Sequence, residues 1–337
     1  MRGMTPNVRR RPSIRWWLAR LVLAVAAGLG IALAIDIVRL GGPESWLIRH
    51  RLPPPYVASG TVVEVNGIAT YIDCRGAGSL TVVLESGLGT GAAGWGFVPE
   101  RLAGTVRVCA WDRPGIGNSA PMGRHTAGDL AAHLRSTLAT AGETGPFVVV
   151  GHSLGGVYAR VFASIYRDEV VGIALIDAYL PDVRPVERIE MDPALRDEWL
   201  ANLTSTNRLI AATEDLDWAA TEADLAAASI DGLPLELVFV DQRLRWDARF
   251  DPVETELIAT WRNLVGSLSS DHRLTIAENS THMIQWDSPE LVVDAVRRLV
   301  AASGAIDGTV VDDERPAWAW YGGRRWPIGC SHMSWYG

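Results

Sequence analysis

The segment that decides the fold is Val148-Val149-Val150-Gly151-His152-Ser153-Leu154-Gly155-Gly156. Its valines predict a buried β-strand, and an apolar helical pattern follows over Gly155–Ile165. Between strand and helix stands Gly-x-Ser-x-Gly, where glycines are needed because so tight a turn leaves no room for side chains. Such a turn lifts the Ser153 hydroxyl clear of the sheet, at the positive end of the following helix. Ser153 is therefore a candidate nucleophile.

Short β-branched runs bounded by glycine or proline predict eight strands. They are Thr61–Val65, Ile68–Cys74, Thr81–Glu85, Val106–Trp111, Phe147–Val150, Val171–Ile176, Leu235–Val240 and Arg273–Ala277. Helical patterns occupy Asp129–Ala141, Gly155–Ile165, Val253–Leu268 and Pro289–Ala302. The first two strands are joined by Asn66-Gly67, a strong hairpin signal. A hairpin followed by alternating strands and helices predicts an α/β fold, a mostly parallel sheet with helices on both faces.

One segment interrupts this alternation. Residues 181–233 are rich in Ala, Asp and Glu, contain helical stretches and stand between two predicted strands. We interpret them as a small helical cap inserted into a core formed by residues 52–180 and 234–303. The tail, residues 304–337, holds four tryptophans without a helical or strand period, and we expect it to be disordered.

Composition and charge exclude several classes of function. The chain has 337 residues, and all 31 of its basic residues are arginine, which excludes Schiff-base lysine chemistry. Residues 1–51 carry nine arginines against two acids, a net charge of +7, whereas residues 52–337 carry 22 arginines against 37 acids, a net charge of −15. So acidic a body is unsuited to nucleic acid, because phosphate contacts need clustered basic residues.

The basic end predicts contact with a membrane. Six arginines precede an uninterrupted apolar run from Leu21 to Ile35, and the wider stretch 16–38 is long enough to span a bilayer. The arginine bias predicts an anchor with its N-terminus in the cytoplasm and the catalytic body outside. The alternative is a cleaved signal peptide, for which Ala32-Leu33-Ala34 offers a site, and the protein would then be secreted.

His282 is the candidate base among the seven histidines. A serine nucleophile needs a group that takes its proton. His282 follows the last predicted strand, in a loop leading to the helix opened by Ser288-Pro289. It is therefore expected on the C-terminal rim of the sheet, where Ser153 also lies. The ring of His152 is expected to point into the turn rather than at the hydroxyl.

Three motifs in this order resemble the α/β-hydrolase superfamily, in particular its serine hydrolases. They are Asp112-Arg113-Pro114-Gly115-Ile116-Gly117-Asn118-Ser119, Gly151–Gly156, and His282 with Asp287-Ser288-Pro289. The resemblance covers roughly residues 60–302. It implies an eight-stranded sheet whose second strand neighbours the fourth, which would bring Cys74 and Cys109 close enough to form a disulfide.

The resemblance also implies an acid that holds the tautomer of His282. Most members of the family carry it several residues past the seventh strand, where Asp241 and Asp247 match the spacing poorly. A subset carries it after the sixth strand, where this chain has Asp177. We therefore expect Asp177 to be the acid, with Asp241 and then Asp247 as alternatives.

Two backbone N–H groups are expected to bind the oxyanion formed during the reaction. One belongs to Leu154, directly after the nucleophile. The other is assigned to Leu88, in the loop Ser86-Gly87-Leu88-Gly89 after the third strand.

These features predict a serine hydrolase that cleaves a small carboxylic ester through an acyl-enzyme on Ser153. The same residues would serve a thioesterase, a lactonase or a cofactor-free haloperoxidase. The alternative outside enzymes is a non-catalytic binding module of the cell surface with the same fold. We expect no cofactor and no metal, because no His or Cys pairs stand at ligand spacing. The sequence carries no signal of oligomeric state.

Overall fold

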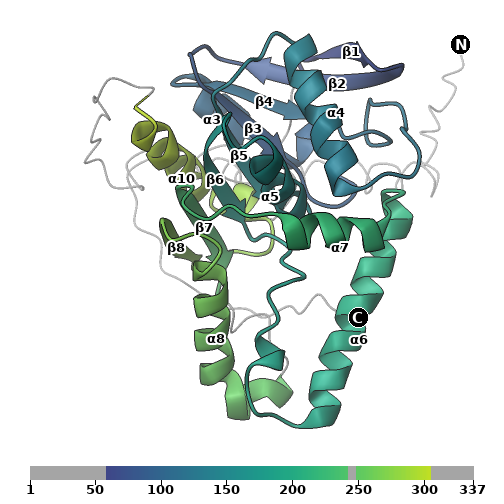
Figure 1. Cartoon of the computed structure of the whole chain (residues 1–337). Helices are drawn as coiled ribbons and strands as arrows, with labels where there is room; N and C mark the ends of the chain where they lie inside the picture. Colours follow the sequence, from purple (N-terminus) through teal and green to yellow (C-terminus); the bar gives the residue numbers. More distant parts are fainter. Residues whose placement is uncertain (1–57, 242–247, 305–337) are drawn as a thin grey trace, which may run out of the picture. The chain divides into compact units, whose positions relative to one another are not determined.

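The computed structural model describes residues 58–241 and 248–304, and eight strands form a single sheet in the order β1-β2-β4-β3-β5-β6-β7-β8 (Figure 1). The strands are β1 (Thr61–Val65), β2 (Ile68–Arg75), β3 (Thr81–Glu85), β4 (Arg107–Trp111), β5 (Phe147–His152), β6 (Val170–Ile176), β7 (Leu235–Val240) and β8 (His272–Ala277). β2 runs antiparallel to β1 and β4, and the remaining neighbours are parallel. The predicted fold class, and the neighbouring second and fourth strands, are confirmed.

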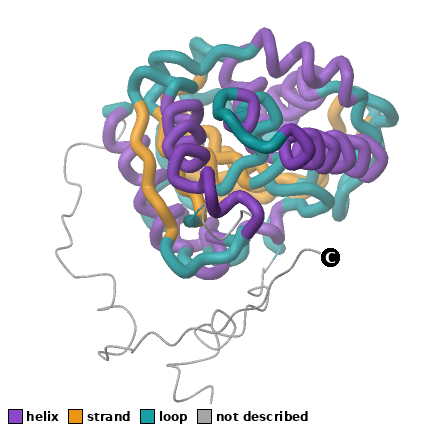
Figure 2. Tube along the Cα trace, turned by 90° about the horizontal axis from the view of Figure 1, so that it is seen from below, coloured by secondary structure: helices purple, strands orange, loops and turns teal. Residues whose placement is uncertain are grey.

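Helices cover both faces of this sheet, as the alternating pattern predicted; Figure 2 shows them on either side of the strands. The helical elements are η1 (Ala92–Trp95), α3 (Val98–Ala103), α4 (Ala127–Thr140), α5 (Gly155–Ile165), η2 (Pro185–Glu187), α6 (Pro193–Thr213), α7 (Trp218–Ala227), η4 (Ala248–Val253), α8 (Glu254–Gly266), α9 (Ile284–Asp287) and α10 (Pro289–Ala302).

The side chains of each central strand alternate between two apolar cores. On β5, Val149 packs in the core that holds α4 and α5, while Val148 and Val150 pack in the core that holds α3 and α10. All six residues of β5 are buried. A parallel strand that is covered on both faces has apolar residues at every position, because each side chain enters a core. The valine run therefore correctly predicted a buried strand.

Local hydrogen bonds set the start of α4 two residues before the predicted one. The Thr126 side chain accepts the Asp129 N–H at 3.1 Å, and the Asp129 carboxylate accepts the Thr126 N–H at 3.0 Å. This reciprocal capping box satisfies donors that a helix start otherwise leaves open. The helix therefore begins at Ala127.

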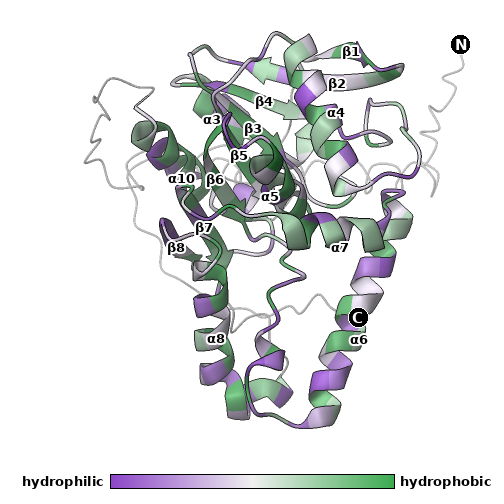
Figure 3. Cartoon of the chain, in the orientation of Figure 1, coloured by the Kyte–Doolittle hydropathy of each residue, from purple (hydrophilic) through white to green (hydrophobic). Residues whose placement is uncertain are grey.

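The segment between β6 and β7 forms a helical insertion, as the sequence indicated. It carries η2, α6 and α7, and α6 displays polar and apolar residues along its length (Figure 3). A small separate apolar cluster joins Val186 and Ile189 of this segment to Phe250 and Leu257 of η4 and α8. Packing of the cap thus extends to residues that follow β7.

A disulfide links two neighbouring strands of the sheet. Cys74 of β2 lies directly opposite Cys109 of β4, and their Cα atoms are 4.0 Å apart. The bond that the resemblance implied is therefore present.

Within the described ranges, no helix combines the length and the apolar character that crossing a bilayer requires. The apolar run Leu21–Ile35 lies outside those ranges.

Candidate active site

Ser153 lies at the sharp turn between β5 and α5. Its φ is +52°, a left-handed conformation that few non-glycine residues adopt. The turn admits no side chain on either flank: a Cβ on Gly151 would lie 2.5 Å from the Gly155 carbonyl oxygen, and a Cβ on Gly155 would lie 2.1 Å from the Glu85 carbonyl oxygen. The glycines of Gly-x-Ser-x-Gly are therefore steric requirements, and the Ser153 side chain stays partly exposed above the sheet.

His282, in the loop after β8, faces Ser153. Its Nε2 lies 2.9 Å from the Ser153 Oγ, and its side chain is 47% exposed. The loop is pinned at two points. The His282 carbonyl oxygen lies 2.9 Å from Nε2 of His152, and the Thr281 N–H donates to the Asp287 carboxylate at 2.6 Å. The predicted direction of the His152 ring, away from the hydroxyl, agrees with this contact.

Asp177 completes the chain of hydrogen bonds. It follows β6 directly with a φ of +41°, and its buried Oδ2 lies 2.6 Å from Nδ1 of His282. Its Oδ1 accepts the Val240 N–H at 3.3 Å. Both ring nitrogens of His282 are thus engaged, one by Asp177 and one by Ser153.

The two alternative acids stand elsewhere. Asp241 follows β7 and is half-buried, while the ring nitrogens of His282 lie against Asp177 and Ser153. Asp247 lies outside the described residues.

The two expected oxyanion donors belong to the residue after Ser153 and to a loop that approaches Ser153. Leu154 is the last residue before α5, and neither its N–H nor that of Leu88 donates a hydrogen bond within the described part of the chain. The loop that carries Leu88 approaches Ser153 closely, since a Cβ on Gly87 would lie 3.2 Å from the Ser153 Cβ. Backbone N–H groups that point at a developing oxyanion stabilise it, and Leu88 and Leu154 stay the expected donors here.

A buried charged cluster lies below this loop, and sequence reasoning did not find it. The Arg113 guanidinium donates to both carboxylate oxygens of Glu214, at 2.9 and 2.5 Å, and lies 3.6 Å from Glu85. Burial raises the pKa of Glu85 to about 7, although Arg113 acts against this shift. Burial also acts to raise the pKa of Glu214, but the charge and hydrogen bonds of Arg113 outweigh it and lower that pKa. The only sequence signal was the place of Arg113 in the Asp112–Ser119 motif.

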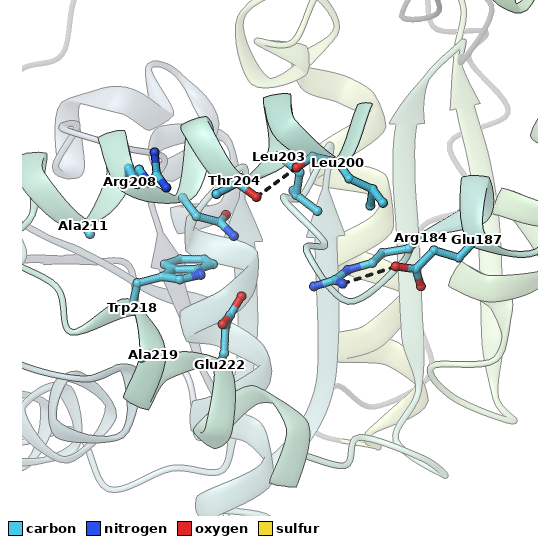
Figure 4. A pocket seen from close by; sticks show the side chains of 11 residues that line it. Arg184, Glu187, Leu200, Leu203, Thr204, Arg208, Ala211, Trp218, Ala219 and Glu222 are labelled. Carbon is cyan, nitrogen blue, oxygen red and sulfur yellow. Dashed lines mark hydrogen bonds and ion pairs between the residues drawn. The ribbon is translucent and has the colours of Figure 1, made fainter. Parts of the chain in front are cut away.

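A groove of about 500 Å³ lies in the cap between α6 and α7 (Figure 4). Its lining includes Leu200, Leu203 and Trp218, with charged side chains among them. Tyr179 joins it to the nucleophile, because its N–H donates to the Ser153 carbonyl at 2.8 Å while its hydroxyl donates to Asn207 in the groove lining. The buried Trp218 Nε1 has no hydrogen-bond acceptor among the described residues.

One grouping of metal-ligating atoms occurs within residues 58–241 and 248–304, and it does not fit a metal. It comprises Cys74, Cys109 and Glu143. Both sulfurs are joined in the disulfide, and Glu143 pairs with Arg107 at 2.7 Å. The two sulfurs are therefore not thiolates, the form in which cysteine binds a metal.

The profile of the alpha/beta hydrolase family matches residues 82–295, which include Ser153, Asp177 and His282. The chain belongs to the alpha/beta hydrolase family.

Two relatives are similar to this chain over different lengths. An uncharacterized protein of Schizosaccharomyces pombe is 45% identical over 82 residues, which is 24% of this chain but only 15% of that protein. The uncharacterized Bacillus subtilis protein YqjL is 26% identical over 233 residues, 68% of this chain and 87% of its own length.

The fold of this alpha/beta hydrolase also occurs in solved structures. One is a candidate lipase from Acinetobacter baumannii, with a TM-score of 0.53 and 20% identity over 73% of this chain and 92% of that one. At this identity the likeness concerns the fold alone.

Proposed function

We propose that this alpha/beta hydrolase is a serine hydrolase that cleaves a small carboxylic ester through an acyl-enzyme on Ser153. The observation that carries the proposal is the hydrogen-bonded series Ser153–His282–Asp177, with distances of 2.9 and 2.6 Å. A weakly acidic hydroxyl becomes a nucleophile when a positioned base takes its proton and a third group orients that base. The three residues stand in this relation.

In the first half of the reaction, the Ser153 Oγ attacks the carbonyl carbon of the ester. Its proton passes to Nε2 of His282, and the carbonyl π electrons move onto oxygen, which becomes the oxyanion. The N–H groups of Leu88 and Leu154 bind that oxygen. The oxyanion then collapses, the bond to the alcohol oxygen breaks, and the alcohol leaves with the proton held by His282.

In the second half, water attacks the acyl-enzyme. His282 takes a proton from the water, the tetrahedral intermediate forms again, and Ser153 leaves with that proton. One ester and one water are thus converted into one acid and one alcohol. Asp177 retains its charge throughout and stabilises the imidazolium of His282.

The cap groove is the proposed site for the part of the substrate remote from the ester bond. Tyr179 separates it from Ser153 by the length of one side chain, with a hydrogen bond at each end. Leucines and Trp218 favour an apolar group there.

Labelling with a fluorescent fluorophosphonate tests the proposal, using the full chain in detergent beside a Ser153→Ala variant. We expect the wild type to take up the label and to hydrolyse short p-nitrophenyl esters, and the variant to do neither. A folded wild type that takes up no label would contradict the proposal and favour a non-catalytic binding module.

We also propose that residues 1–51 tether the protein to a membrane with the hydrolase body outside the cytoplasm, or export it after cleavage. The Cys74–Cys109 disulfide supports an oxidising compartment. Fractionation of cells that express the full chain should place it with the membranes and release it only with detergent. Secretion of a chain that begins after Ala34 would favour the cleaved form, and a chain wholly in the cytosol would contradict both.

A further inference from the structure

The buried Arg113–Glu214 pair connects the cap to the loop after β3. Arg113 is 1% exposed and Glu214, which follows the last residue of α6, is 6% exposed. The same guanidinium that holds Glu214 also donates to the carbonyl oxygens of Ser86 and Gly87, at 2.7 and 2.8 Å. Arg113 therefore fixes the start of the loop.

Glu214 fixes the other end of the loop. Its Oε1 accepts the Gly89 N–H at 2.9 Å, across a sequence separation of 125 residues. All three peptide groups that join Ser86 to Gly89 are thus held by this one ion pair, through the carbonyl oxygens of Ser86 and Gly87 and the N–H of Gly89. The N–H between them, that of Leu88, has no acceptor among the described residues.

A buried ion pair is an expensive way to attach a cap. Removing two charges from water costs several kcal/mol per ion, and apolar residues of similar volume often stabilise a protein as well or better. A forked, charge-assisted contact does fix geometry, however, since its donors and acceptors have defined directions. An oxyanion donor needs such geometry, because its benefit depends on being in place before the charge develops.

We infer that Glu214 is a positioning residue, by which the cap holds the Leu88 N–H in place as the second oxyanion donor. The inference rests on the proposed function and extends it: the cap contributes to the chemical step as well as to substrate binding. Loss of the Glu214 carboxylate frees the Gly89 N–H and leaves Arg113 as a buried, half-paired cation. The Leu88 N–H then turns away from Ser153 for part of the time.

The test compares Glu214→Gln with wild type on a short p-nitrophenyl ester. Glutamine keeps the shape but has only one acceptor oxygen, so in either orientation its NH₂ group faces an N–H donor, that of Arg113 or that of Gly89. Removal of one oxyanion donor typically lowers kcat by about 10²–10³-fold, so displacement of one should lower kcat by roughly tenfold to a hundredfold. KM should stay within about twofold, because the ground state does not use this donor.

A second readout isolates the oxyanion. An aryl trifluoromethyl ketone forms a tetrahedral adduct in which Ser153 bonds to the carbonyl carbon, its proton goes to His282, and the carbonyl oxygen becomes negative. Its inhibition constant should rise in Glu214→Gln by the same factor by which kcat/KM falls. If Glu214 only attached the cap, the inhibition constant and kcat/KM would not change by the same factor.

Glu198→Gln is the matched control. Glu198 is also on α6, but it pairs with Arg249 of η4 at 2.7 Å, and the side chains of both residues are about half exposed. We expect wild-type kcat and inhibition from this variant. If Glu214→Gln does not fold, Glu214→Asp replaces it, since it keeps the charge beside Arg113 and withdraws the carboxylate from the Gly89 N–H.

Wild-type kcat in a folded Glu214 variant would overturn the inference, and so would a loss confined to KM. The proposed function fails separately, through absence of fluorophosphonate labelling in wild type. Suppose that wild type is labelled and hydrolyses esters, and that a Glu214 variant has the same kcat and inhibition constant. The proposed function would then stand, and the positioning role of Glu214 would be wrong.

Discussion

At the scale of single residues, Asp177 is held by two donors of different kinds. Val240 donates its N–H to Oδ1, and Nδ1 of His282 lies against Oδ2. An asparagine in this place would keep its oxygen on the Val240 N–H and present its NH₂ to His282. His282 would then carry its proton on Nε2 and could not accept one from Ser153.

Asp177→Asn should therefore lower kcat by a factor on the order of 10⁴, the effect of replacing the triad acid by asparagine in a serine protease. Steady-state hydrolysis of a p-nitrophenyl ester measures it. Asp241→Asn is the control and should retain activity within about twofold. The opposite pattern, with Asp241→Asn inactive and Asp177→Asn active, would reassign the acid.

Glu85 predicts how stability depends on pH. Its folded-state pKa is about 7, raised from 4.5 mainly by burial, with Arg113 and Glu214 as its charged neighbours. Between these two values the folded state holds the proton and the unfolded state releases it. The free energy of unfolding should therefore fall as pH rises from about 4.5 to 7, by about 3 kcal/mol from this group, and stay lowered above pH 7.

Glu85→Gln removes this contribution, because an amide does not titrate. Urea unfolding at pH 5, 6, 7 and 8 should show a steeper decline for wild type than for the variant. Parallel curves for the two proteins would mean that Glu85 titrates near its ordinary value.

At the scale of elements, α6 and α7 shape the groove that we assign to the substrate. Trp218 begins α7, packs 6.2 Å from the Tyr179 ring and lines the groove. Trp218→Ala should raise KM about tenfold for p-nitrophenyl hexanoate and much less for the acetate, because only the longer acyl chain reaches the groove.

Leu209→Ala provides the comparison for this variant. Leu209 is also on the cap but is 59% exposed and does not line the groove. It should leave the ratio of the two KM values unchanged. An equal rise for acetate and hexanoate in Trp218→Ala would place the acyl chain elsewhere.

At the scale of the whole molecule, the disulfide ties the antiparallel edge of the sheet to its parallel centre. Cys74 and Cys109 close a loop of 35 residues between β2 and β4. Closing such a loop stabilises a protein by about 4 kcal/mol in the chain-entropy description, through restriction of the unfolded chain. Cys74→Ala with Cys109→Ala should lower Tm by ~10 °C.

Differential scanning calorimetry measures this change, with Cys330→Ser as the control that leaves the pair intact. The double variant should also lose the response of the wild-type Tm to reductant. If neither the double substitution nor the reductant changes Tm, the disulfide contributes little to stability.

Local sequence patterns determined the elements. Each predicted strand has a counterpart in the sheet, and Gly155–Ile165 and Pro289–Ala302 are helices as expected. These features follow from periodicity, from β-branched runs and from glycines that a tight turn requires, all of which act over a few neighbouring residues. The Ser153 turn is the clearest case, because the glycines that its tight geometry requires lie within five consecutive residues.

Contacts between distant residues depended on the tertiary structure. The family resemblance favoured Asp177 over Asp241 and Asp247 as the acid, and strand order brings Asp177 to His282 across 105 residues. The sequence carried no sign that Glu214 of the cap would reach Gly89 across 125 residues. The sequence by itself thus determined the sheet, its helices and the candidate nucleophile and base. Only tertiary structure decided what orients them, because those contacts depend on strand order and cap packing rather than on neighbours along the chain.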